Sequence, residues 1–218
     1  MSNYLVLLSL FSMPLACMHD ERLKLDRFDS IIDDEIDTHL AMHQEHTQAK
    51  QALLLMIQED QGLRRQALRT GHLYNNAQAT ELNKKHVAIL KNIIRQFGWP
   101  SQETFNEDCS FAAWLIAQHA NHDLDFQKQA RNNVSYLDER FAPIYWVFLT
   151  DRILANENKP QLYGTQYAQD GILWPINDPD NLDKRRKAMQ LSPMEKYQDI
   201  MAVKFLQLKC ASPALPSE

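Results

Sequence analysis

The stretch Phe111–Asp123, with the sequence FAAWLIAQHANHD, constrains the fold more than any other part of the chain. It opens with seven consecutive apolar residues, which give way to Gln118 and His119. A helix that is apolar on every side is normally buried against several neighbours, so these two polar residues lie at the edge of a packed core. Polar groups in such a place need hydrogen-bond partners. The sequence therefore predicts a helical core with a polar network or a site beside it.

Turn-forming residues are scarce, and the chain has 5 glycines among 218 residues. Within residues 25–40 and 82–94, apolar side chains recur every three or four positions, which is typical of amphipathic helices. Gln161–Ile176 departs from this pattern, because two runs with aromatic and β-branched residues flank Asp170-Gly171, a common hairpin turn. We therefore expect a mainly α-helical single domain, with about six to eight helices and one small β-hairpin near residues 161–176.

The N-terminal stretch Tyr4–Ala16 is largely apolar and holds no charged residue. It is too short to span a bilayer but has the length of a signal-peptide core. Ala16 before Cys17 is similar to a lipoprotein cleavage site, so we expect export to the periplasm, membrane or outside, with Cys17 as a lipid anchor. No Lys or Arg precedes the stretch, and Pro14 stands where such signals usually carry Leu. The alternative is an apolar segment retained in a cytoplasmic protein.

The predicted organisation has three parts. Residues 1–17 form the signal peptide or apolar segment, residues 18–208 form one helical domain, and residues 209–218 form a disordered tail. If the first cysteine is lipidated or removed, Cys109 and Cys210 remain and could form a disulfide. Reduced, unrelated thiols are the alternative.

The charge balance argues against some partners. The net charge is −5, and the one basic run, Lys184–Lys187, lies among acidic residues and indicates a solvated helix face. A chain of this kind lacks the basic surface that binds nucleic acid or anionic membranes. We therefore expect neither a nucleic-acid partner nor a transmembrane span.

Several short motifs follow one another between Gln58 and Tyr197. They are Asp60-Gln61 with Arg64, Phe97–Pro100, Gln118–Ala120, Thr150–Arg152, Tyr163–Gln166 and Arg185-Arg186. In this order and spacing the chain resembles the bacterial domain-of-unknown-function family six-six-two-four, whose hallmarks are a QHAD stretch and a YGTQ stretch. That family has no established activity, so the resemblance marks positions without giving them a role. Asn121 stands where the QHAD stretch has Asp.

The motif residues suit binding of a small polar ligand or hydrolase-type acid–base chemistry. His119 has an unperturbed pKa near neutrality, which makes it the candidate general acid or base. We expect Asp151 to orient His119, and Arg152 to clamp a carboxylate or phosphate through its planar fork. The expected ligand contacts are Gln118, Thr165, Gln166, Asp60, Gln61 and Arg64. The sequence identifies neither the ligand nor a cofactor.

Two other functions fit the same residues. The first is a non-enzymatic exported protein or lipoprotein, whose polar motifs only hold the fold together. The second is a metal phosphohydrolase of the all-helical HD type, because His86, His122-Asp123 and Asp151 could supply metal ligands. Such ligand positions are easily filled in a chain with 8 histidines, so we assign no metal site.

Overall fold

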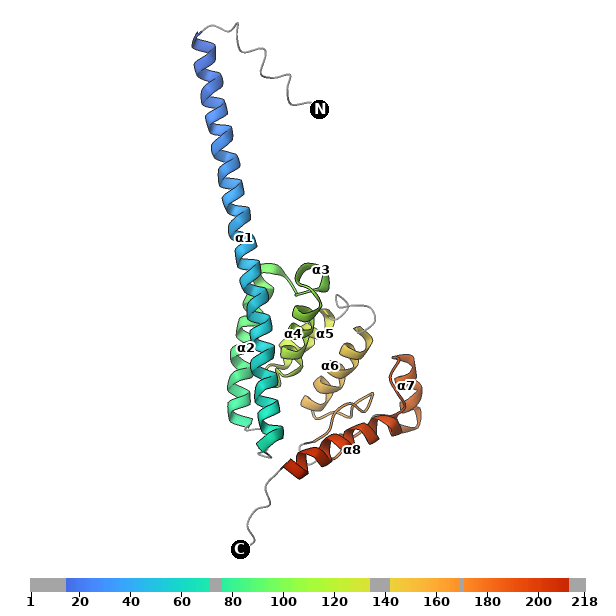
Figure 1. The fold of residues 1–218 in the computed structure, drawn as a ribbon. Helices are drawn as coiled ribbons and strands as arrows, with labels where there is room; N and C mark the ends of the chain where they lie inside the picture. The colour runs from blue at the N-terminus through green and yellow to red at the C-terminus, as the bar shows by residue number, and fades with distance from the viewer. Residues whose placement is uncertain (1–14, 71–75, 134–141, 169–170, 212–218) are drawn as a thin grey trace. The chain divides into compact units, whose positions relative to one another are not determined.

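The computed structural model describes residues 15–70, 76–133, 142–168 and 171–211. They form eight α-helices and one short 3-10 helix, η3 (Figure 1). The helices are α1 (Leu15–Thr70), α2 (Asn76–Phe97), α3 (Gln102–Phe105), α4 (Glu107–Gln118), α5 (Leu124–Asn133), α6 (Ala142–Asn156), α7 (Leu182–Ala188) and α8 (Met194–Ala211), with η3 at Pro179–Asn181. The prediction of a mainly helical protein is confirmed.

The chain divides into two compact units, Met1–Gln48 and Ala49–Glu218. In the first unit, the described residues belong to α1, and Ile36, Leu40 and Met42 have exposed side chains. The stretch from Tyr4 to Pro14 lies outside the described residues. The predicted signal peptide, the lipid anchor at Cys17 and the three-part organisation therefore stay predictions. Among the described helices, none combines the length and the apolar character needed to cross a membrane.

Helix α4 is the centre of the second unit, as its apolar sequence predicts. Ala112, Ala113 and Ala117 are fully buried, and α4 packs against α2, α5 and α6 (Figure 1). The small alanine side chains let these neighbours approach closely, while Trp114 packs on Tyr145 of α6 with a ring separation of 4.5 Å. Asn106 caps the start of the helix, and its side chain accepts a hydrogen bond from the Cys109 N–H. This packing brings Gln118 and His119 to the edge of the core.

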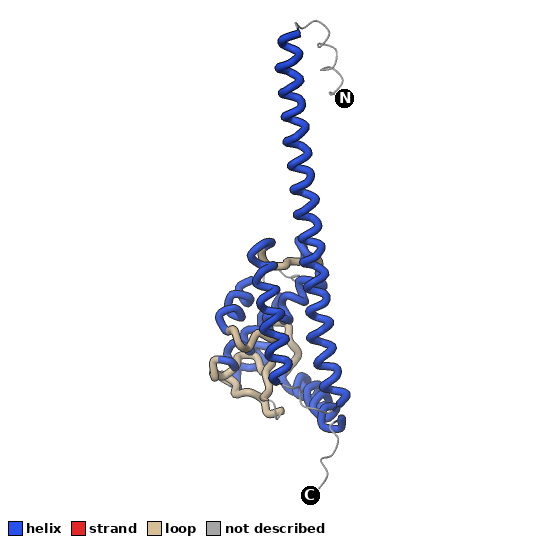
Figure 2. Tube along the Cα trace, turned by 90° about the vertical axis from the view of Figure 1, so that its left-hand side faces the viewer, coloured by secondary structure: helices blue, strands red, loops and turns tan. Residues whose placement is uncertain are grey.

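The predicted β-hairpin near residues 161–176 is wrong. The described part of this segment contains two isolated β-bridges, Gln161 with Ile176 and Tyr167 with Leu173, and it holds no strand (Figure 2). Asp170, in the predicted turn, lies outside the described residues.

Side chains compete with a strand ladder for the backbone of this segment. Asp151 accepts hydrogen bonds from the N–H groups of Leu162, Tyr163 and Thr165. Gln161 donates to the carbonyl oxygens of Gln166 and Trp174, and it accepts from the Gln166 N–H. These bonds use several of the groups that longer strands would need. Backbone pairing across the segment is therefore short, with Ala168 N–H donating to the Ile172 carbonyl and Trp174 N–H to the Gln166 carbonyl.

Cys109 is a buried free thiol, so the predicted disulfide with Cys210 is not formed at Cys109. Its S–H lies 3.8 Å from the Lys50 carbonyl oxygen, and burial raises the pKa of the thiol. A buried thiol with a raised pKa is unreactive, because the thiolate is the reactive form.

Candidate functional site

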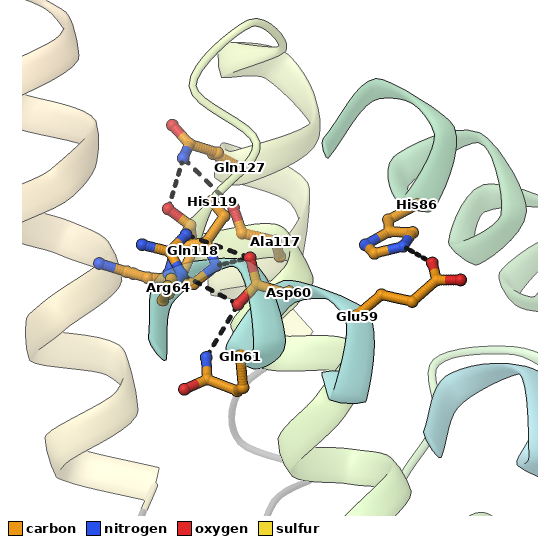
Figure 3. Close-up of polar contacts among 9 residues, drawn as sticks. All are labelled: Glu59, Asp60, Gln61, Arg64, His86, Ala117, Gln118, His119 and Gln127. Atoms are coloured by element: carbon orange, nitrogen blue, oxygen red, sulfur yellow. Dashed lines mark hydrogen bonds and ion pairs between the residues drawn. The ribbon is translucent and has the colours of Figure 1, made fainter. Parts of the chain in front are cut away.

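Asp60 on α1 joins two of the sequence motifs. Its Oδ1 atom lies 3.1 Å from Nδ1 of His119, although 59 positions separate these residues along the chain. Arg64 donates from Nε to Oδ2 at 3.0 Å and from Nη2 to Oδ1 at 3.1 Å, and Gln61 donates to Oδ2 at 2.8 Å (Figure 3). Asp60 and Arg64 are one helical turn apart, so the helix itself presents this bidentate pair. The predicted residues Asp60, Gln61, Arg64 and His119 therefore form one cluster.

His119 follows directly after the last residue of α4, and its N–H bonds to the carbonyls of Leu115 and Ile116. The carbonyls of Ala117 and Gln118 accept hydrogen bonds from the Gln127 side chain, which is fully buried (Figure 3). Two of the last carbonyl groups of the helix thus bond to a buried side chain. These bonds hold the His119 ring, which keeps 13% of its side-chain surface exposed.

The electrostatics of the pair leave His119 neutral. Burial lowers the pKa of His119 to about 4, and the nearby Asp60 carboxylate opposes this only partly. Burial alone would raise the pKa of Asp60, but His119 and Arg64 outweigh it and hold that pKa below the usual range. At neutral pH the pair therefore consists of an ionised carboxylate and an uncharged imidazole.

The proton of the neutral ring belongs on Nδ1, since an ionised carboxylate lies beside that atom. The Nδ1–H bond is not directed at the carboxylate oxygen, so the contact is electrostatic rather than a well-formed hydrogen bond. Nε2 is then the unprotonated nitrogen, with a lone pair that can accept a proton or a hydrogen bond.

His119 lines a small pocket of about 210 Å³. Asn121, two positions after His119, also lines it, and the other lining residues come from α1, α2 and α6: Arg64, Ala79, Thr80, Asn83 and Arg152. Of these, Arg64 and Arg152 were predicted site residues, whereas Thr80, Asn83 and Asn121 were not. Thr80 and Asn83 belong to the polar face of α2, which looks like an ordinary solvated face in the sequence. Asn121 could have been found, because it immediately follows the Gln118–Ala120 motif.

Arg152 is the least satisfied charged group of the pocket. Its Nε is buried, and no group in the described part of the chain accepts a hydrogen bond from it. Burial, with the repulsion of Arg64, lowers the pKa of Arg152 to about 10, so it still carries its charge at neutral pH. The Arg152 side chain as a whole is partly buried. A partly buried charge without a counter-ion is unfavourable, and a bound anion would relieve it.

Asp151 does not orient His119, contrary to the prediction. Its fully buried carboxylate accepts from Oγ1 of Thr165 at 2.9 Å in addition to the loop N–H groups. Burial raises the pKa of Asp151, and these hydrogen bonds oppose the shift. Gln166 donates to the same Thr165 hydroxyl, while Gln118 donates to the Phe148 carbonyl. These four predicted residues thus belong to a network that fastens the loop after α6, separate from the Asp60–His119 cluster.

A metal centre is not assembled in the part of the chain that the structure describes, where no group of three or more potential ligands gathers. His86 lies 2.8 Å from a Glu59 oxygen, and Asp123 pairs with Lys91. Of the residues proposed for a metal phosphohydrolase, His86, Asp123 and Asp151 are therefore engaged in other contacts, as Figure 3 shows for His86.

A second pocket, of about 530 Å³, lies between α1 and α2. Its lining includes Glu59, Leu63, Glu81 and Lys85, and none of the predicted site residues. It is larger than the pocket at His119, but its exposed lining surface is mainly apolar.

Residues 47–209 match the model of a family of unknown function (DUF6624). No curated protein and no solved structure matches the chain.

Proposed function

The chain belongs to the DUF6624 family of unknown function, as its motifs indicate, and we propose that its small pocket binds an anionic ligand through Arg152, Arg64 and His119. A ligand with a carboxylate or phosphate group has the charge and size that suit this lining. Guanidinium groups are well adapted to such anions because their planar forks donate two parallel hydrogen bonds.

The observation that carries the proposal is the buried Nε of Arg152, which has no hydrogen-bond partner among the described residues. Arg64 already has a counter-ion in Asp60, and the single negative charge of Asp60 is shared with Gln61 and His119. Arg152 lines the same pocket with a buried Nε that bonds to no described group. The pocket is therefore short of negative charge by about one unit, which a small anion would supply.

The Asp60–His119 pair favours hydrolase-type acid–base chemistry as a second candidate function. A neutral imidazole with its proton on Nδ1 can take a proton at Nε2 from water or from a hydroxyl group of the ligand. Turnover of small phosphate or carboxylate esters that His119→Gln abolishes would support this function. A full ester panel without turnover would remove it and leave the binding function in place.

The residues Asp151, Thr165 and Gln166 support the alternative in which polar motifs are structural. Their donors and acceptors are mostly used within the protein, so they have little left for a ligand. We therefore exclude these three from the proposed binding site.

The experiment is a titration of the purified full chain with phosphate, sulfate and acetate, followed by calorimetry and thermal unfolding. Wild type should bind at least one of these anions, and Arg152→Gln should weaken the binding by about tenfold or more. Arg95→Gln is the matched control, since Arg95 is an exposed arginine of α2 that bonds to Asn92. If wild type binds none of the three anions, or if Arg152→Gln weakens binding no more than Arg95→Gln does, the proposal is wrong.

A further inference from the structure

The polar groups of the pocket are unequally divided between donors and acceptors. Arg152 and Arg64 only donate hydrogen bonds. Asn121 uses its carbonyl oxygen to accept from Asn156 Nδ2 at 3.2 Å, which leaves its own NH₂ group as a donor. These donors surround the space that a bound anion would occupy.

The Nε2 atom of His119 is an acceptor without a hydrogen of its own, whereas Thr80 and Asn83, the other polar residues of this lining, can both donate and accept. The carboxylate of Asp60 accepts hydrogen bonds from Gln61 and Arg64 and lies against Nδ1 of His119. No described residue donates to Nε2, and the ring retains exposed surface where it lines the pocket. Its lone pair would repel an oxygen atom that carries no hydrogen, and it would accept a hydrogen bond from an oxygen atom that does.

We infer that the pocket selects a tetrahedral oxyanion that still carries a proton, namely phosphate or the monoanion of a phosphate monoester, over the fully ionised sulfate. This inference rests on the proposed anion-binding function and adds the identity of the ligand class. Inorganic phosphate keeps at least one proton throughout the neutral range, whereas sulfate and simple carboxylates keep none.

The preference for phosphate arises mostly because the pocket disfavours sulfate. Sulfate has the same shape as phosphate and nearly the same charge, so both anions satisfy Arg152 equally well. With sulfate, however, the lone pair of Nε2 faces an oxygen lone pair in a partly buried pocket, and its hydrogen bond is not formed. The discriminating residue is therefore His119, acting on the ligand and not on the fold.

The test compares inorganic phosphate, methyl phosphate and sulfate, each titrated into the full chain by calorimetry at about pH 6 and about pH 8. We expect phosphate to bind about tenfold or more tightly than sulfate at both pH values. Methyl phosphate loses its last proton near pH 6, so its binding should weaken at pH 8. Methyl phosphate could instead bind as tightly as phosphate at both pH values while sulfate binds weakly. The proton on the ligand would then not determine binding, and the inference would be wrong.

Variants of two histidines complete the test. His119→Gln should bring the affinities for phosphate and sulfate close together, because a glutamine amide can donate as well as accept. His43→Gln, at an exposed position of α1, should keep the wild-type preference. Equal binding of phosphate and sulfate by wild type overturns this inference but leaves the proposed function intact. Absence of binding by all three anions overturns both, and the wild-type comparison decides the matter even if His119→Gln does not fold.

Discussion

Two buried aspartates of the chain have opposite surroundings. Asp60 is surrounded by side chains that belong to the pocket, whereas Asp151 accepts mainly from backbone N–H groups of the loop after α6. Asp151→Ala would leave three N–H groups, one buried and two partly buried, and the buried Thr165 hydroxyl without their acceptor. We expect it to lower the free energy of unfolding by about 3 kcal/mol or more, measured by urea denaturation.

The matched control for this prediction is Asp199→Ala, on the exposed face of α8, which should change stability by less than about 0.5 kcal/mol. Folded Asp151→Ala protein should still bind the anion that wild type binds. If it is as stable as wild type but no longer binds, Asp151 belongs to the site and not to the scaffold.

At the scale of the elements, the loop after α6 depends on one backbone position. Gly164 has φ of +72°, and a Cβ atom added there would lie 2.8 Å from Sδ of Met194. Gly164→Ala should therefore destabilise the fold by about 1–2 kcal/mol, from the left-handed backbone and the displaced Met194. Gly62 provides the comparison, because it lies inside α1 with nothing within 4 Å of an added Cβ.

Gly62→Ala should stabilise the protein by about 0.5–1 kcal/mol, the usual gain of alanine over glycine within a helix. Thermal unfolding of both variants beside wild type measures the two effects with opposite signs. Equal destabilisation by both substitutions would mean that the loop does not depend on a glycine at position 164.

The same loop shows what the sequence could and could not predict. Local patterns were sufficient for α4, since seven apolar residues in a row leave few alternatives to a buried helix. They failed for residues 161–176, because strand pairing there competes with acceptors from outside the segment, above all Asp151. Pairing of His119 with Asp60 was missed for a similar reason: the packing of α1 against the end of α4 has no signature in the spacing of motifs. The cluster of Asp60 with Arg64 was visible, because it lies within one helix turn.

For the whole molecule, the Asp60–His119 pair links stability to pH. The pKa of His119 falls from an ordinary 6.5 to about 4 on folding, so between these values the unfolded chain binds the proton more readily than the folded one. Asp60 acts in the same direction, since its pKa is lowered in the folded state. A group that binds protons better when unfolded makes the free energy of unfolding fall as the pH falls. We therefore expect the protein to lose stability as the pH is lowered from about 6.5 toward 4.

Urea denaturation of wild type and His119→Gln at about pH 7 and about pH 4.5 measures this effect. The glutamine variant cannot titrate at position 119, so its stability should fall less between the two pH values than that of wild type, even if it is less stable at pH 7. His43→Gln removes an exposed histidine and should keep the wild-type pH dependence. Asp151 acts in the opposite direction, because a raised carboxyl pKa favours the folded state at low pH. A wild-type stability that is flat or rises toward pH 4.5 would therefore mean that Asp151, and not the Asp60–His119 pair, dominates the proton balance of folding.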